Sequence, residues 1–272
     1  MNFDWNIKIL PNCYRIARYD LIVRTVKIMK YTVFVKKIIP ALLIYFLFTA
    51  NTAAEDLKVC TWNINKGVKF QRVLDELKRA PLAGCDVLAL QEVMPADQEK
   101  QARMIAGTLK ATYARGGRDV IVTKLPIVRY GEIRLRSGRN ATWADIRSRS
   151  GVTFRVYDVH LSYKIGINPF MPEKRKEEME KILQHAEDFN GPVIVAGDFN
   201  TIGWLLGGQS SDPVPALLRR AGYTEASFKG RTNLLCGKID WIFVKGMKTG
   251  QARLGSYAGS DHKWITADLQ LP

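Results

Sequence analysis

Acidic, amide and imidazole side chains occur in three separate segments of the sequence, each next to an apolar run. The segments are Gly197-Asp198-Phe199-Asn200, Lys238-Ile239-Asp240 and Ser260-Asp261-His262. Apolar residues 193–196 lead into the first segment, and apolar residues 241–244 follow the second. Acids at strand ends indicate a pocket on a rigid sheet, and Asp, Asn and His together suit a hard divalent cation and proton transfer. Phosphoester hydrolysis needs a divalent cation and a group that transfers protons.

The elements that must position these residues alternate between strands and helices from residue 57 onward. Helices are predicted at 70–79, 97–109, 173–189 and 214–221. Strands are predicted at 57–62, 86–90, 120–123, 133–135, 143–146, 154–161, 193–196, 239–244 and 264–269. This alternation is typical of one α/β domain. The adjacent strands between residues 120 and 161 indicate antiparallel pairing within a mixed sheet.

Short motifs with polar residues follow one another in a fixed order. They are Trp62-Asn63, Gln91-Glu92, His160-Leu161, Gly197-Asp198-Phe199-Asn200, Ile239-Asp240 and Ser260-Asp261-His262. Their order and spacing resemble those of the endonuclease/exonuclease/phosphatase superfamily, and the resemblance covers residues 57–271. It implies a four-layer α/β sandwich, in which two packed mixed β-sheets are flanked by helices. It also implies an active site at one edge of the sandwich.

The resemblance and the ligand chemistry together suggest a Mg²⁺ site, with Mn²⁺ as the alternative ion. Glu92 is the expected main ligand, because Mg²⁺ takes one or two carboxylates beside waters and substrate phosphate oxygens. Asn63 is expected to support the metal ligand and the phosphate. Asn65 stands where abasic-site endonucleases carry an Asp, so its metal contact should be weaker. Asp261 is expected to complete the metal shell.

The expected catalytic residues surround the phosphate. Asp198 and Asn200 lie two positions apart and should face the same side of an extended segment. Asp198 would orient or deprotonate the attacking water, and Asn200 would donate to a phosphoryl oxygen. His262 is expected at the phosphate, with Asp240 accepting from its other ring nitrogen and raising its pKa. General base and charged phosphate clamp both remain open for this pair.

The other two histidines, His160 and His185, are expected to play different parts. The resemblance to the deoxyribonuclease branch implies that His160 also faces the phosphate. Asp119 stands about where that branch has an acid paired with its first His, although a strand-edge Asp is an equally good interpretation. His185, in the charged helix at 173–189, is expected to be an ordinary surface residue.

Substrate contacts are expected from one arginine and two apolar loops. Gly138-Arg139 resembles the Gly-Arg of abasic-site endonucleases, so Arg139 is assigned to substrate binding. The other arginines near it indicate either a phosphate track or a solvated hairpin; they are Arg134, Arg136, Arg147 and Arg149. Phe170 in the loop 163–172 and Trp204 in the loop 201–208 are assigned to the pocket rim. These loops would either dip into a lipid surface or pack on each other.

The first 54 residues are typical of a leader rather than of the folded domain, which is placed at residues 55–272. Lys30, Lys36 and Lys37 precede an apolar run at 38–50, and the small residues Thr52-Ala53-Ala54 follow it. This pattern predicts a secretory signal peptide, with Met29 as the expected start. The alternative is an uncleaved N-terminal membrane anchor. The expected location is therefore periplasmic or secreted.

The net charge indicates which classes of partner the protein could bind. The net charge is +15, and residues 55–272 keep 33 basic and 24 acidic residues, a net charge of +9. Such a charge favours binding to polyanions, or else serves only solubility.

Three cysteines in the domain are too few for a disulfide framework, and their spacing does not fit a zinc site. Cys60 is expected in the core.

These observations predict an exported Mg²⁺-dependent phosphodiesterase, with DNA or RNA as the first substrate. The alternatives are a phospholipid phosphodiesterase of the sphingomyelinase type, a small-molecule phosphatase, or a binding module that has lost turnover. Partners are therefore expected to be nucleic acid or an anionic membrane. No specific protein partner is indicated, and a monomer is expected.

Overall fold

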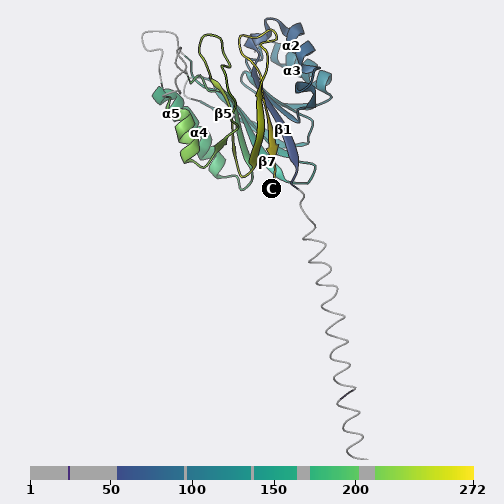
Figure 1. Cartoon of the computed structure of the whole chain (residues 1–272), viewed down its shortest axis with the longest axis vertical. Helices are drawn as coiled ribbons and strands as arrows, with labels where there is room; N and C mark the ends of the chain where they lie inside the picture. The colour runs from purple at the N-terminus through teal and green to yellow at the C-terminus, as the bar shows by residue number, and fades with distance from the viewer. Residues whose placement is uncertain (1–23, 25–53, 95–96, 136–137, 164–171, 202–211) are drawn as a thin grey trace, which may run out of the picture. The chain divides into compact units, whose positions relative to one another are not determined.

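A computed structural model describes residues 24, 54–94, 97–135, 138–163, 172–201 and 212–272 (Figure 1). The chain divides into two compact units, Met1–Thr52 and Ala53–Pro272. Phe170 and Trp204 lie outside the described residues, so their assigned roles stay predictions. In the part of the chain that is described, no helix is both long and apolar enough to cross a bilayer. The fold below is that of the second unit.

The first sheet contains both ends of this unit and has the strand order β11-β12-β1-β2-β4-β3. Its strands are β1 (Asp56–Asn63), β2 (Val87–Gln91), β3 (Thr112–Gly116), β4 (Asp119–Thr123), β11 (Lys248–Leu254) and β12 (Ile265–Gln270). β1 pairs parallel with β2, while the other pairs are antiparallel. The sheet is therefore mixed. Its central strands β1 and β2 are largely buried: β2 is apolar up to Gln91, and the charged residues of β1, Asp56 and Lys58, stand only where that strand is exposed or partly exposed.

The second sheet repeats this plan with the strand order β5-β6-β7-β8-β10-β9. Its strands are β5 (Ile127–Arg134), β6 (Asn140–Arg147), β7 (Thr153–His160), β8 (Val193–Asp198), β9 (Thr224–Glu225) and β10 (Asp240–Lys245). β7 and β8 run parallel, and the helix between them makes the crossover that a parallel pair requires. The remaining pairs are antiparallel.

Three apolar clusters divide the domain into four layers. Side chains of both sheets, among them Ile121 and Val156, meet in the central cluster. α2 (Phe70–Leu77) and α3 (Gln98–Leu109) cover the outer face of the first sheet. α4 (Pro172–Glu187) and α5 (Pro213–Arg220) cover that of the second sheet, and Figure 1 shows the two helix pairs on opposite sides. Short turns η1 (Asn65–Gly67) and η2 (Leu82–Gly84) complete the elements. The predicted four-layer sandwich is confirmed.

The structure corrects the predicted assignment of strands to sheets. β4 belongs to the first sheet, whereas β5, β6 and β7 form an antiparallel run in the second. The chain passes from one sheet to the other at residues 124–126, which include Pro126, and proline ends strand pairing by lacking an N–H. Only the later strands between residues 120 and 161 therefore pair as predicted. Cys60 is buried in the core, and Cys60, Cys85 and Cys236 are all free.

Candidate active site

The predicted site residues lie at the ends of neighbouring strands. In the second sheet, Asp198 at the end of β8 stands opposite His160 of β7 on one side and Asp240 of β10 on the other. In the first sheet, Asn63 ends β1 opposite Gln91, which ends β2 and precedes Glu92. A hydrogen bond from Asn63 Nδ2 to Asp198 Oδ2, of 3.0 Å, joins the two sheets at this edge. The six motifs therefore converge as the sequence indicated.

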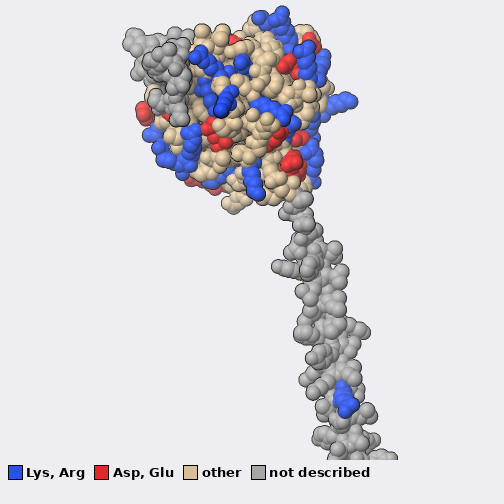
Figure 2. Space-filling view, viewed as in Figure 1, with Lys and Arg blue, Asp and Glu red and all other residues tan. Residues whose placement is uncertain are grey.

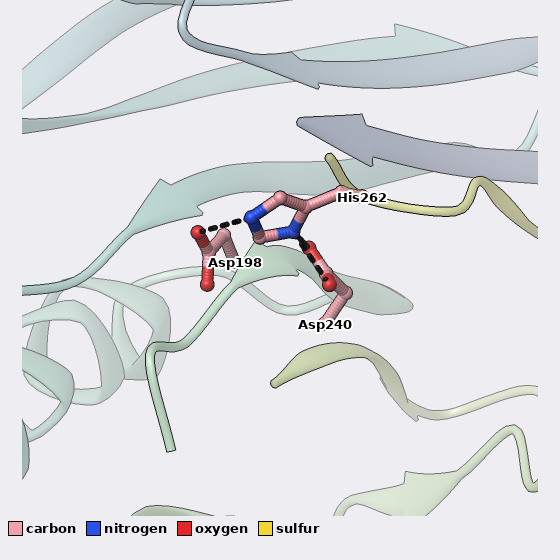
Figure 3. A group of neighbouring side chains, drawn as sticks. All are labelled: Asp198, Asp240 and His262. Atoms are coloured by element: carbon pink, nitrogen blue, oxygen red, sulfur yellow. Dashed lines mark hydrogen bonds and ion pairs between the residues drawn. The ribbon is translucent and has the colours of Figure 1, made fainter. Parts of the chain in front are cut away.

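Asp198, His262 and Asp240 form a buried row (Figure 3). His262 Nδ1 lies 2.9 Å from Asp240 Oδ2 and 3.1 Å from Oδ1, which is the contact predicted from the sequence. The other ring nitrogen, Nε2, lies 3.8 Å from Asp198 Oδ2. The imidazole is thus held by one carboxylate and faces a second.

Burial and charge set the protonation of this row. Burial lowers the pKa of His262, but the Asp240 and Asp198 charges outweigh it and raise the pKa to about 10. Burial is the largest cause that raises the pKa of Asp198 to about 7, and the Asp240 charge adds to it. His262 is therefore an imidazolium at neutral pH, while Asp198 exchanges a proton there. An imidazolium suits a phosphate clamp, and Asp198 suits a base.

Backbone contacts hold His262 in place. Trp62 donates its indole N–H to the His262 carbonyl at 3.0 Å, and the His262 N–H donates to Ser260 Oγ at 3.0 Å. Ser260 Oγ in turn donates to the Asn63 carbonyl at 2.6 Å. Thr232 Oγ1 accepts from the Asp240 N–H at 3.2 Å. Thr232 and the Ser260 hydroxyl were not predicted to have a role, because a single hydroxyl group forms no sequence pattern that indicates its contacts.

The predicted geometry of Asp198 and Asn200 is wrong. Asn200 has φ of +50°, and its N–H donates to Asp198 Oδ1 at 2.9 Å, so the chain turns after β8 and does not stay extended. Its side-chain Nδ2 donates to the Leu161 carbonyl at 2.9 Å. Asp and Asn side chains commonly bond the backbone two residues away, and this preference overrides the alternation of a strand. Here the amide of Asn200 fixes the end of β7.

His160 lies between two acids. Its Nε2 is 3.4 Å from Asp198 Oδ2 and 3.8 Å from Glu92 Oε1. Burial lowers its pKa well below the ordinary value, and the charges of Arg139, His262 and Arg118 lower it further. His160 is therefore a neutral imidazole. Nδ1 of His160 and Oδ1 of Asp119 are both buried, with no hydrogen-bond partner among the described residues, so the suggested Asp119–His160 hydrogen bond is not formed.

The donors around Asn63 fit a hard metal ion. Glu92 is partly exposed, and its φ of +57° ends β2 and turns the chain away from the sheet. Asp261 follows Ser260, whose hydroxyl bonds the end of β1. Asn63 uses Oδ1 to accept from the Asn65 N–H at 3.0 Å and Nδ2 to hold Asp198, so it acts mainly by positioning. Carboxylates such as those of Glu92 and Asp261 are ligands that Mg²⁺ accepts beside several waters.

A second donor group is formed by the buried row itself. Ligand atoms of Asp198, Asp240 and His262 all lie within 4.8 Å of one another. The raised pKa of His262 favours a ring protonated on both nitrogens, which offers no nitrogen lone pair as long as no metal is bound. Glu92 and Asp261 stay the predicted metal ligands, while Asp198 and Asp240 offer further carboxylate oxygens within the row.

Arg139 lies just before the start of β6, whereas Arg147 and Arg149 lie at or just after its end. Arg139 lies beside the site, with NH1 3.4 Å from the His160 carbonyl. Arg149 pairs with Asp86 at 2.5 Å and with Glu55 at 3.5 Å, near the start of β1 and away from Asn63. β6 runs away from the site, so Arg147 at its end also lies far from it. Arg147 and Arg149 therefore lie away from the site, whereas Arg134 pairs with Asn140 next to Arg139, and Arg136 lies outside the described residues.

His185 is not an ordinary surface residue. Its Nδ1 lies 2.7 Å from the Tyr157 hydroxyl, and its ring packs against Trp143. It belongs to the packing of α4 on the second sheet, where its partner Tyr157 on β7 stands opposite Val195, which precedes Asp198 on β8.

Comparison with known proteins agrees with the fold and the convergent motifs. The sequence model of the Endonuclease/Exonuclease/phosphatase family matches residues 60–262 of this chain. The chain belongs to this family. Enzymes of the family hydrolyse phosphoester bonds and generally use divalent metal ions, and the chain is such a hydrolase.

Individual relatives are more distant. A UPF0294 protein of Vibrio vulnificus is 24% identical over 233 residues, which cover 79% of this chain and 78% of that protein. A solved endonuclease/exonuclease/phosphatase family protein of Bacteroides thetaiotaomicron gives a TM-score of 0.64 at 16% identity, covering 82% of this chain and 97% of that one. A mannosyl-6-phosphatase of the same organism gives 0.61 at 16% identity, covering 78% and 99%. These two likenesses show the fold alone.

Proposed function

We propose that this family member is an exported, Mg²⁺-dependent phosphodiesterase that cleaves DNA or RNA. The observation that carries the proposal is the buried row Asp198–His262–Asp240, with Glu92 3.8 Å from His160 and Asp261 next to His262 in the sequence. One part of this arrangement handles protons, and the other suits a divalent ion. The excess of Lys and Arg on residues 55–272, seen in Figure 2 as blue side chains spread over the visible face, supports a polyanionic substrate.

The reaction would be in-line attack of water on phosphorus. When Mg²⁺ is bound, it supplies Lewis-acid stabilisation of charge on the phosphoryl oxygens. Asp198 Oδ2, held by Asn63, would accept the proton of the attacking water. The imidazolium of His262, held by Asp240, would stabilise charge on the phosphate through its Nε2–H. Neutral His160 would donate a hydrogen bond beside them.

Export is proposed from the leader pattern at residues 1–54. Its basic residues, apolar run and small residues support cleavage after Ala54, and a membrane anchor is the alternative. Comparing the mass of the mature chain from a periplasmic extract with that of the full chain tests this. Retention of residues 30–54 in that extract contradicts cleavage.

A phospholipid substrate is the second candidate, because exposed leucines lie close to the site. Leu234 and Leu235 are 66% and 72% exposed, and they follow Asn233, which is bridged to His262. Apolar side chains beside a phosphodiesterase site suit contact with a lipid surface. Phe170 and Trp204 would act in the same way. A small-molecule phosphatase is also supported, since one similar structure is a mannosyl-6-phosphatase.

Substrate panels separate these candidates. Supercoiled plasmid, single-stranded RNA, phosphatidylcholine–sphingomyelin vesicles and mannose 6-phosphate are each incubated with the full chain and Mg²⁺. The proposal expects cleavage of at least one nucleic acid. Hydrolysis of vesicles alone, reduced by Leu234→Ser with Leu235→Ser, favours the lipid candidate. Release of phosphate from the sugar alone contradicts the nuclease proposal and favours a phosphatase.

A further inference from the structure

Two buried charged side chains lie on α4, outside the site described above. Arg175 and Glu178 stand one turn apart on this helix and are only 2% and 1% exposed. Charged side chains are almost never buried so fully unless they are paired. This pair contacts Ser162, which follows β7, and Asp212, which caps the start of α5. Figure 1 shows α4 and α5 side by side.

The pair holds Ser162 by all three of its polar groups. The Ser162 N–H donates to Glu178 Oε2 at 2.8 Å, and the Ser162 hydroxyl donates to Oε1 of the same carboxylate at 2.5 Å. The Ser162 carbonyl accepts a longer contact, 3.4 Å, from Arg175 NH1. Arg175 also donates from Nε to Asp212 Oδ2 at 2.8 Å. One turn of α4 therefore fastens the end of β7 to the start of α5.

Ser162 is connected to the proposed base by one further residue, Leu161. The Leu161 carbonyl accepts from Asn200 Nδ2 at 2.9 Å, and the Leu161 N–H donates to the Asp198 carbonyl at 3.0 Å. The Asn200 N–H in turn donates to Asp198 Oδ1 at 2.9 Å. Leu161 is wholly buried and directly follows His160. A displacement of Ser162 would therefore reach both His160 and the carboxylate of Asp198.

Stability alone does not account for charged side chains at this place. Replacing a buried ion pair by well-packed apolar side chains is often neutral for stability. The hydrogen bonds of Glu178 are directional, however, and bonds to a charged group are shorter and stronger than those between neutral groups. A carboxylate that accepts two of them fixes both the position and the rotation of the peptide that it holds. Reacting groups need such support, because they must be held to within about 0.5 Å of the productive geometry.

We propose that Glu178, supported by Arg175, is a positioning residue for the hydrolytic site. It fixes Leu161 and Ser162 at the end of β7 and, through Leu161, the carboxylate of Asp198 at the end of β8. The inference rests on the proposed role of Asp198 in hydrolysis. It goes beyond that role, because it makes a helix on the outer face of the second sheet part of the catalytic geometry.

Steady-state kinetics of the full chain with Mg²⁺ and bis(p-nitrophenyl) phosphate tests the effect on turnover. Glu178→Leu removes both acceptors and should lower kcat about 10- to 100-fold with little change in KM, the loss expected when a reacting group moves by about 1 Å. Glu178→Gln keeps an oxygen for the Ser162 N–H and should retain most of the rate. Glu180→Leu is the matched control, because Glu180 is exposed on the same helix and pairs only loosely with Lys176, at 3.9 Å.

A double variant distinguishes positioning from a general loss of stability. Asn200→Ala removes the side-chain bond to the Leu161 carbonyl. If Glu178 acts through Leu161, the Glu178→Leu, Asn200→Ala chain should lose clearly less kcat than the product of the two single losses. Losses that multiply would show that Glu178 does not act through this contact, and would overturn the inference.

Amide hydrogen exchange gives a readout that needs neither metal nor substrate. In Glu178→Leu, exchange should speed up at least about 10-fold in peptides that contain residues 160–162 and 198–200, because the hydrogen bonds described above weaken. Ser162→Ala removes only the hydroxyl bond and leaves α4 intact, so it should give a smaller increase in the same peptides. Glu180→Leu should keep the wild-type rates.

The two readouts separate this inference from the proposed function. Unchanged exchange at residues 198–200 in both Glu178→Leu and Ser162→Ala overturns the inference, even where kcat falls. Faster exchange with a near-normal kcat overturns the positioning role. Faster exchange in a protein whose wild-type form hydrolyses no phosphoester contradicts the proposed function instead, and supports the connection from α4 to β8.

Discussion

At the scale of single residues, the proposed chemistry depends on carboxylates that act on different partners. Asp240 holds His262 at 2.9 Å, and Asp198 faces the same ring at 3.8 Å. The first contact keeps a positive charge where phosphate would bind, whereas burial, with the Asp240 charge adding to it, raises the pKa of Asp198 to about 7.

Loss of either reacting group should reduce turnover strongly. Asp198→Ala and His262→Ala should each lower kcat more than about 10²-fold, the scale on which one transition-state donor acts. His185→Ala is the matched control, because His185 packs on Trp143 outside the site. Steady-state kinetics measures all three. Near-normal turnover in either site variant would sink the mechanism.

The pH dependence follows from the raised pKa values. Asp198 must lose its proton to act as a base, so kcat/KM should rise as pH passes about 7. His262 must keep its proton to clamp phosphate, so the rate should fall near pH 10. Asp240→Asn removes the negative charge that raises the pKa of His262, and an opposite charge at this range shifts a pKa by about 1–3 units.

The upper limb of the profile should therefore move to lower pH in Asp240→Asn. The lower limb should also move down, because the Asp240 charge raises the pKa of Asp198. A profile with limbs at unchanged pH would show that the pair does not control the rate.

Residue types could be assigned from the sequence, but their exact contacts could not. The Asp240–His262 contact was predicted correctly, because strand-end motifs in a known order leave few alternatives. The side-chain direction of Asn200 was not, since a local turn decides it. Arg118, whose charge lowers the pKa of His160, was missed because the turn Gly116-Gly117-Arg118-Asp119 gives no signal until β3 and β6 are placed together.

At the scale of elements, the end of β8 depends on a glycine. Gly197 has φ of +142°, and a Cβ there would lie 2.0 Å from the Val159 carbonyl oxygen on β7. Gly197→Ala must therefore move β8 relative to β7 and displace Asp198. We expect a lower melting temperature and lower kcat together. Thermal unfolding and steady-state kinetics measure the two effects.

Gly107→Ala provides the contrast. Gly107 lies in α3 with nothing within 4 Å of an added Cβ. Alanine should stabilise the helix by up to about 1 kcal/mol and leave kcat unchanged. Equal melting temperatures for the two alanine variants would contradict this account of β8.

A buried acid between the sheets gives a pH-dependent prediction of stability. Asp158 on β7 accepts from Gln91 Nε2 of β2 at 2.6 Å, and burial raises its pKa to about 8. Because the pKa of Asp158 is higher in the folded state than in the unfolded state, its contribution to the free energy of unfolding falls as pH rises from about 4 to 8. Asn at 158 carries no charge and can donate to Gln91 Oε1, which has no partner among the described residues.

Asp158→Asn should therefore raise the melting temperature, and more at pH 8 than at pH 5. Each kcal/mol corresponds to about 2–4 °C for a domain of this size. Melting curves across that pH range measure the difference. An increment that is independent of pH would show that Asp158 is ionised in the fold.

Element prediction from sequence succeeded where burial gives a clear period. β2 and β8 are largely apolar because both faces are covered, β1 and β7 keep apolar residues at most buried positions, and the helices show an apolar stripe. β3 (Thr112–Gly116) and β11 (Lys248–Leu254) were missed because they are edge strands with exposed polar residues. β5 was predicted too short for the same reason. Their pairing is a tertiary effect that local pattern does not encode.

At the scale of the whole molecule, charge should control the affinity for polymer but not for a small ester. Binding of DNA by a basic protein releases counterions, so affinity falls steeply with salt. We expect KM for plasmid to rise at least about 10-fold between 50 and 200 mM salt. KM for bis(p-nitrophenyl) phosphate should change little. A similar change for both substrates would show that the basic surface plays no part.

The central claim is that the Asp198–His262–Asp240 row and the adjacent carboxylates hydrolyse phosphodiesters in nucleic acid. Cleavage of supercoiled plasmid by the full chain tests it most directly, with Mg²⁺, with chelator, and with His262→Ala. The account predicts nicking that requires Mg²⁺ and is lost in the variant. Nicking that survives chelation or the loss of His262 would contradict it, and so would an intact plasmid with every ion and salt concentration tried.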